Sequence, residues 1–301
     1  MKHEESQKTR QKLSFLHNHY IPRKLFCDDL DVSSVIVPEF YPDLNNTYIG
    51  NMCYFDSLEN YFDYMETKQP YPCKITYSIE NINILKNISQ LNHLMRRGLR
   101  IVQLYHTKSN RFFSCNEGLT NEGLALLKKI EELDMILDLS HIPEKLLRPV
   151  INYFSGRMII SHCACSDLYI DKIPRANSLS MKTIESISKY GIIFGVAFLN
   201  DIVSAQAAPC NINTEELFLN IVEQIKMFAS VVGIDHVALG PDYLDTLYFS
   251  QRWNVKLLFP EILLNEEGFK CLYKELSTRS LDSTDIDKLF YLNTESLLGF
   301  F

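Results

Sequence analysis

The sequence predicts an α/β fold, a (β/α)₈ TIM barrel that forms a single domain over residues 1–301. A chain of 301 residues with 46% hydrophobic content can bury one large core. Short apolar runs alternate with segments of helical periodicity, which is typical of βα units around a parallel sheet. There are eight such runs, the number of strands in this barrel.

The eight candidate strands are residues 13–17, 33–38, 74–80, 99–106, 135–141, 157–162, 191–198 and 236–242. Segments 119–133 and 214–232 have apolar residues at helical spacing and are predicted helices that pack on the barrel. Asn213 followed by Glu216 predicts a capped start for the second helix. Residues 39–72 and 243–262, rich in aromatics and proline, are expected to be long loops that shape a substrate pocket.

Composition excludes several functional classes. The formal charge of −7 gives no basic footprint, so nucleic acid is not an expected partner. The polar first residues and the absence of any apolar stretch of membrane-spanning length lead us to expect a cytoplasmic protein with no membrane partner.

The eight cysteines lack a compact regular spacing and are interpreted as reduced thiols. A thiolate metal site at residues 162–165 would need a second ligand pair.

Polar side chains occur at the C-terminal ends of six predicted strands: His17, Glu80, His106, His141, His162 and Asp242. In a parallel barrel these ends converge on one face, where barrel enzymes keep their active sites. We therefore expect residues more than two hundred positions apart to line one pocket.

The histidines suggest a metal site. His17 and His19 are two apart on a strand, so both imidazoles can point the same way, although surface or core histidines also explain such a pair. His141 and His162 each follow an apolar run and a serine, and about one βα repeat separates them, so neighbouring strands would present them side by side.

Two carboxylates complete the candidate site. Glu80 could bridge two divalent ions or could simply stabilise the start of the following helix. Asp242 could carry a proton between a water molecule and a leaving amine, or could cap a loop or a helix.

Together these segments resemble the membrane (renal) dipeptidase family, peptidase family M19, within the amidohydrolase-like barrels. The matching stretches run from about residue 13 to the C-terminus, and they are HNHYIP (17–22), SIEN (78–81), LDLSH (137–141), IISHC (159–163), IPRAN (173–177) and GIDHVALGPDY (233–243). The most specific block is GLTNEGLALLKKIEELDMILDLSH (118–141), where motif order and spacing both agree.

The resemblance implies a metallo-dipeptidase that holds two zinc ions and hydrolyses small dipeptides with a metal-activated water. It implies metal ligands at His17, Glu80, His141 and His162, with Glu80 bridging and His19 at the family's aspartate position. It implies that His106 binds substrate and steadies the tetrahedral intermediate, that Arg175 holds the substrate's terminal carboxylate, and that Asp242 is the acid/base. The expected partner is a small dipeptide, and a homodimer is left open.

The chain departs from the family pattern at three places. His19 replaces an aspartate, so one ion would lose a negative ligand, which leaves the second zinc site open. Asn81 replaces the glycine after the bridging glutamate, and Asp242-Tyr243-Leu244-Asp245 replaces a DFDG segment. Two other functions therefore stay open. One is another amidohydrolase-type enzyme acting on a cyclic amide, lactone or phosphoester, and the other is a non-catalytic barrel with a decayed metal site.

Overall fold

The computed structural model describes residues 11–16, 30–39, 74–80, 82–106, 109–169, 177–203, 213–243, 259–279 and 281–299. Eight of its strands pair in parallel to form a closed ring in the order β1-β2-β3-β4-β7-β8-β10-β11, and β11 pairs again with β1. Their bounds are β1 (Gln11–Phe15), β2 (Leu30–Glu39), β3 (Lys74–Ile79), β4 (Leu99–Gln103), β7 (Ile136–Asp138), β8 (Met158–Cys165), β10 (Ile193–Val196) and β11 (Val237–Leu239). The predicted (β/α)₈ barrel is confirmed.

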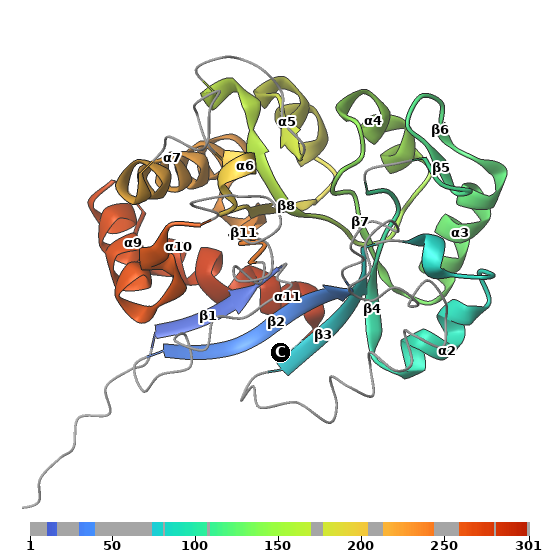
Figure 1. Ribbon diagram of the computed structural model, residues 1–301, viewed down its shortest axis with the longest axis horizontal. Helices are drawn as coiled ribbons and strands as arrows, with labels where there is room; N and C mark the ends of the chain where they lie inside the picture. Colours follow the sequence, from blue (N-terminus) through green and yellow to red (C-terminus); the bar gives the residue numbers. More distant parts are fainter. Residues whose placement is uncertain are drawn as a thin grey trace, which may run out of the picture.

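Helices surround the ring, with α2, α3 and α4 on one side and α7, α9 and α10 on the other (Figure 1). The α-helices are α2 (Gln90–Arg96), α3 (Asn121–Glu132), α4 (Glu144–Asn152), α5 (Met181–Ser188), α6 (Asn200–Val203), α7 (Thr214–Val232), α9 (Glu266–Thr278), α10 (Ser283–Asp287) and α11 (Asn293–Leu298). Shorter elements are the 3₁₀ turns η2 (Ile82–Ile84), η3 (Ser166–Leu168), η5 (Ile234–His236) and η6 (Glu261–Leu264), the π-helix η7 (Lys288–Leu292), the hairpin of β5 (Phe113–Ser114) with β6 (Gly118–Leu119), and β9 (Ser178–Leu179) beside β8.

The two predicted helices form close to their expected bounds. Thr120 caps α3 by accepting a hydrogen bond from Gly123 N, and Asn213 caps α7 by accepting one from Glu216 N. Both helices bury an apolar stripe against the strands. Among the described residues, no helix combines the length and the apolar character needed to cross a membrane.

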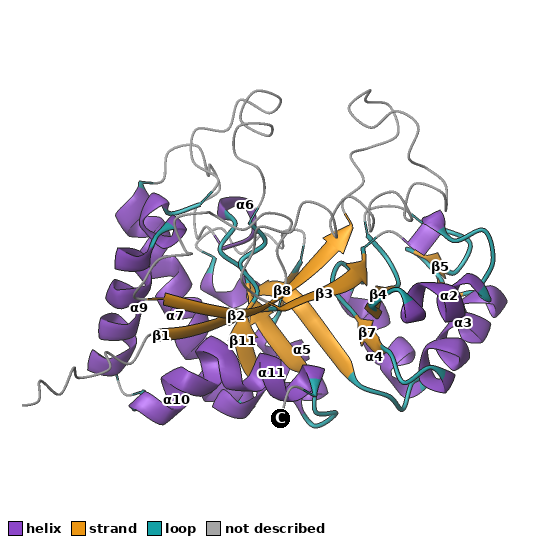
Figure 2. Cartoon of the chain, turned by 90° about the horizontal axis from the view of Figure 1, so that it is seen from below, coloured by secondary structure: helices purple, strands orange, loops and turns teal. Residues whose placement is uncertain are grey.

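The barrel interior is layered. An apolar cluster contains Ile101, Ile136, Ile159 and Ala238 from four strands together with Leu297 of α11. In the side view, α11 lies at the edge opposite α6, which follows the C-terminal end of β10 (Figure 2). Side chains two residues apart on a strand point to the same side, so the next inward positions lie one layer nearer the C-terminal ends. These positions are Gln103, Asp138, Ser161 and Gly240, which makes the layer polar.

Two glycines let three strands approach closely in this layer. A Cβ atom on Gly195 would lie 1.9 Å from the carbonyl oxygen of Ser161, and one on Gly240 would lie 2.0 Å from the same atom. Real side chains cannot occupy that space. The narrow interior beside β8 therefore depends on these two residues.

Candidate metal centre

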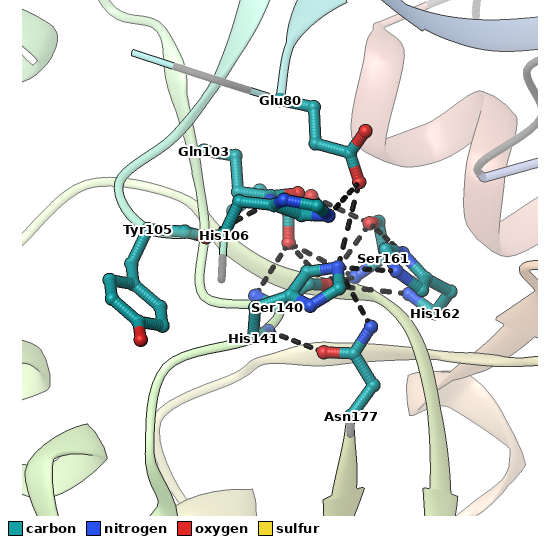
Figure 3. A network of polar contacts seen from close by, with 10 residues as sticks. Glu80, Gln103, Tyr105, His106, Ser140, His141, Ser161, His162 and Asn177 are labelled. Carbon is teal, nitrogen blue, oxygen red and sulfur yellow. Dashed lines mark hydrogen bonds and ion pairs between the residues drawn. The ribbon is translucent and has the colours of Figure 1, made fainter. Parts of the chain in front are cut away.

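Four of the predicted site residues meet at the C-terminal ends of β3, β4, β7 and β8. Figure 3 shows Glu80, His106, His141 and His162 directed toward one another. The Nε2 atoms of His141 and His162 lie 3.1 Å apart, and Glu80 Oε1 lies 3.5 Å from His141 Nε2 and 3.6 Å from His106 Nε2. The structure thus brings together residues that the sequence separates by as many as 82 positions, from Glu80 to His162.

Three of these side chains fit one metal ion. Ligand atoms of Glu80, His141 and His162 all lie within 4.8 Å of one another. In tetrahedral zinc sites with bonds of about 2.0–2.1 Å, neighbouring ligand atoms are about 3.4 Å apart. The observed separations of 3.1 and 3.5 Å are close to that value. One carboxylate and two imidazoles are also a donor set that zinc accepts.

Backbone geometry helps to aim His141. This residue has a φ of 65°, a left-handed conformation that is uncommon outside glycine. Asn177, also left-handed with a φ of 57°, accepts a hydrogen bond from His141 N at 2.5 Å and places its Nδ2 atom 2.9 Å from His141 Nε2. Strand β7 ends at Asp138, three residues before the left-handed His141, and is therefore shorter than the predicted strand 135–141.

A β-bulge aims His162. Between Phe194 and Val196 of β10, the register moves from Ile160 to Cys163 of β8, so β8 has one extra residue. Bulges of this kind redirect side chains next to active sites. As a result, two consecutive residues both reach the site: Ser161 Oγ contacts Asp138, and His162 Nε2 contacts His141.

A buried hydrogen-bond network lies beneath the imidazoles. Asp138 Oδ1 accepts hydrogen bonds from Ser140 N at 2.9 Å, Ser140 Oγ at 2.8 Å and Ser161 N at 3.2 Å. Its Oδ2 atom accepts one from Ser161 Oγ at 2.6 Å, and Ser161 Oγ lies 3.0 Å from His162 Nδ1. Burial raises the pKa of Asp138, and the hydrogen bonds from the two serines oppose that rise.

Burial keeps the imidazoles ready to bind metal. Desolvation lowers the pKa of His141 to about 3, so the ring is neutral at physiological pH. The pKa of His106 is also lowered, by burial first, with the Glu80 charge opposing the shift and His141 adding to it. Neutral imidazole is the form that coordinates a metal ion.

Asp242 is buried and close enough to Glu80 for the charge of that carboxylate to act on it. It follows β11, has a φ of 59° and is 6% exposed. Burial raises the pKa of its carboxyl group well above the usual value, and the charge of Glu80 raises it further. A buried carboxyl group beside a carboxylate is suited to hold a proton at neutral pH.

Three predicted site residues, His17, His19 and Arg175, lie outside the described residues, and their roles stay predictions. Cys163 and Cys165 are buried free thiols, and the clustered ligands found among the described residues do not include them. Cys115 and Cys271 are also free.

Sequence reasoning missed Asp138, Ser161 and Asn177 as parts of the site. Two of them could have been predicted, because Asp138 lies in the LDLSH segment and Ser161 in the IISHC segment that marked the histidines. Strand alternation places Asp138 and Ser140 on one side of the strand, which was a usable signal. Asn177 is the last residue of the IPRAN segment, but its contact with His141 joins residues 36 positions apart, which strand alternation does not reveal.

The chain is similar in sequence to known proteins. A sequence model of the membrane dipeptidase family, peptidase family M19, matches residues 54–295. The chain is 25% identical over 207 residues to an uncharacterized protein in the pqqA 5′ region of Klebsiella pneumoniae, covering 65% of this chain and 70% of that protein. It is 22% identical over 179 residues to the dipeptidase tcpJ of Claviceps purpurea, covering 57% of this chain but only 40% of that protein.

The fold also matches solved structures. A metallo peptidase from Rhodobacter sphaeroides, liganded with a phosphinate mimic of the dipeptide L-Ala-D-Ala, superposes with a TM-score of 0.73 and 15% identity. The match covers 96% of this chain and 99% of that one. At this identity the likeness establishes the fold alone, a (β/α)₈ barrel of the same architecture.

Proposed function

Because this chain belongs to the membrane dipeptidase family, peptidase family M19, we propose that it is a zinc-dependent dipeptidase that hydrolyses the peptide bond of small dipeptides. The observation that carries the proposal is the cluster of Glu80, His141 and His162, whose ligand atoms lie within 4.8 Å of one another at the barrel mouth. The similarity to proteins named dipeptidase or metallo peptidase supports this reaction class.

Glu80, His141 and His162 would hold one zinc ion, and His17 and His19 would join Glu80 around a second. Bound zinc supplies a Lewis acid for the peptide carbonyl and lowers the pKa of a water molecule. Glu80 would contribute to both ions, because a carboxylate offers two oxygens, and its Oε1 atom lies 3.5 Å from His141 Nε2.

The remaining residues would bind substrate and move protons. The side chain of His106 is 30% exposed and its pKa is lowered. Its neutral ring would donate a hydrogen bond to the oxygen of the scissile carbonyl. Asp242 would take the proton of the attacking water and deliver it to the leaving amine. Arg175 would bind the terminal carboxylate through its two-pronged guanidinium group.

Metal content and substrate range test this proposal together. We expect the purified full chain to contain zinc, measured by mass spectrometry, and to cleave L,L- and L,D-dipeptides faster than a lactone, a cyclic amide or a phosphodiester. Replacing both His141 and His162 with Asn should remove one zinc equivalent and abolish hydrolysis. His236→Asn is the matched control, because His236 precedes β11 and lies at the opposite end of the barrel.

The outcomes separate the alternatives. Preferential cleavage of the lactone or phosphodiester would replace the dipeptidase by another amidohydrolase-type enzyme. A protein that binds zinc but cleaves none of these substrates, or that binds no metal, would indicate a non-catalytic barrel.

A further inference from the structure

The buried pair Asp138 and Ser161 lies directly behind His162 and has no place in the chemistry described above. Both side chains are buried inside the barrel, 2% and 0% exposed. Ser161 Oγ connects them, 2.6 Å from Asp138 Oδ2 and 3.0 Å from His162 Nδ1. The contact is to the ring nitrogen that does not face His141.

We propose that Asp138, acting through Ser161, is a positioning residue that keeps the hydrogen of His162 on Nδ1 and leaves Nε2 bare for the metal ion. Four donors converge on the two oxygens of Asp138, which is the pattern around an ionised carboxylate, and an ionised carboxylate can only accept hydrogen bonds. The 2.6 Å contact between Asp138 Oδ2 and Ser161 Oγ therefore uses the hydroxyl hydrogen of Ser161. With that hydrogen committed, Ser161 Oγ can meet His162 Nδ1 only as an acceptor, so Nδ1 carries the hydrogen.

The orientation of Asp138 is itself determined. Its Oδ1 atom is held by three donors, Ser140 N, Ser140 Oγ and Ser161 N. This leaves Oδ2 to face the Ser161 hydroxyl. Partners behind a metal-binding histidine set its tautomer, and their loss typically weakens metal binding by about 10–100-fold.

Asp138→Asn tests the direction of this chain of hydrogen bonds. The three donors should hold the Asn oxygen at the Oδ1 position, so the amide NH₂ would face Ser161 and donate to it. The Ser161 hydroxyl would then donate to His162 Nδ1, and the ring would carry its hydrogen on Nε2. We expect this tautomer switch in the metal-free protein, together with Zn²⁺ binding weakened by about 10–100-fold.

Long-range ¹H–¹⁵N correlation spectra of the ¹⁵N-labelled full chain identify which ring nitrogen carries the hydrogen, and the His162 signals are assigned by their loss in His162→Gln. Zn²⁺ affinity is measured by competition with a chelator. The control is Ser140→Ala, which removes the contacts of Ser140 Oγ with Asp138 Oδ1, Ser161 N and Ser161 Oγ. It leaves the connection from Asp138 Oδ2 through Ser161 Oγ to His162 Nδ1 in place. It should lower the melting temperature without moving the His162 tautomer.

If Asp138→Asn does not fold, two variants of Ser161 test the proposal instead. Ser161→Ala should weaken Zn²⁺ binding, and Ser161→Thr, which keeps the hydroxyl, should restore it. The proposal is overturned if folded Asp138→Asn or Ser161→Ala retains the parent tautomer and Zn²⁺ affinity, or if Ser140→Ala switches the tautomer as fully as Asp138→Asn.

The inference rests on the metal site of the proposed function but not on hydrolysis. A parent protein that binds no Zn²⁺ would contradict the proposed function, while the tautomer in the metal-free protein would still decide the role of Asp138.

Discussion

At the scale of single residues, the centre relies on side chains placed in backbone conformations that they seldom adopt. His141, Asn177 and Asp242 all have positive φ, and strain of this kind concentrates at functional sites. Asn and Asp tolerate the left-handed region better than most residues, whereas His141 is also held by the hydrogen bond from its N–H to Asn177. Among the described residues, one further non-glycine residue has positive φ, Asp134 in the turn before β7, so the other three such residues lie at the proposed reaction site.

The role of Asp242 can be tested with a conservative change. Asp242→Asn keeps the shape and tolerates the φ of 59°, but it cannot exchange a proton. We expect Zn²⁺ content to stay the same while kcat for dipeptides falls by roughly 10²–10⁴-fold, the usual contribution of a general acid/base. Near-parental turnover would show that Asp242 has a different role.

Arg175 is expected to recognise a free carboxylate. Arg175→Ala should raise KM for free dipeptides much more than for their C-terminal amides, because only the free acids can form a two-pronged ion pair. Steady-state kinetics with matched pairs of substrates measure this difference. Equal changes for acids and amides would remove the carboxylate role.

His19 stands where the family has an aspartate, at the second metal ion of the proposed function. A neutral imidazole favours zinc over magnesium or manganese. His19→Asp should keep or tighten metal binding and retain or increase dipeptide hydrolysis, while His19→Ala should lose one of two metal equivalents. Metal analysis and kinetics on the same preparations test this. His19→Ala with parental metal content and turnover would place His19 outside the metal site.

At the scale of elements, the positions of the ligands depend on how β8 fits between its neighbours. The bulge in β8 directs Ser161 and His162 into the site, and Gly195 of β10 and Gly240, which follows β11, leave room for the Ser161 carbonyl group. The same backbone segment therefore carries a candidate metal ligand and the residue proposed to orient it.

Gly195→Ala should disrupt this fit. The new Cβ would lie 1.9 Å from Ser161 O, a backbone atom that cannot move aside without breaking the ladder. We expect a loss of about 3 kcal/mol or more in unfolding free energy, at the upper end for overpacked sites. Gly191→Ala is the control, because it has a φ of +69° but nothing within 4 Å of the added Cβ, and should cost only about 1–2 kcal/mol. Equal losses in urea denaturation would contradict the close approach.

At the scale of the whole molecule, the residues of the proposed metal centre come from three different βα units of the barrel. Glu80, His141 and His162 follow or belong to β3, β7 and β8. A ligand that binds only the native state stabilises that state in proportion to the logarithm of its concentration. Metal binding and barrel stability should therefore be linked.

Metal removal should lower the melting temperature of the full chain. At free Zn²⁺ of 100 times Kd the expected stabilisation is about 2.7 kcal/mol, which corresponds to roughly 5 °C in Tm for a chain of this size. Thermal melts with chelator and with increasing Zn²⁺ measure it, and the variant with both His141 and His162 replaced by Asn should show a smaller shift than the parent, because it loses one of the two proposed ions. A parent Tm that does not depend on Zn²⁺ would contradict the linkage.

The amino-acid sequence by itself determined the barrel and the types of residue in its site. The eight apolar runs correspond to the eight barrel strands, and Asn213 caps its helix as expected, because both patterns depend on residues close together in the chain. Glu80 and His141 follow the ends of β3 and β7 as predicted, whereas β8 continues three residues past His162 to Cys165. Where a strand ends was less readable, since β7 and β11 stop before the left-handed residues His141 and Asp242.

Only the tertiary structure decided how the ligands are oriented. The extra residue in β8 is defined by hydrogen bonds to β10, the support of His141 comes from Asn177, 36 positions away, and the buried Asp138 meets Ser161 across two strands. These features arise from register and packing between distant segments, which local periodicity does not encode. Residue types at strand ends can thus indicate a metal site, whereas the tautomers and angles of its ligands depend on contacts that form only when the barrel closes.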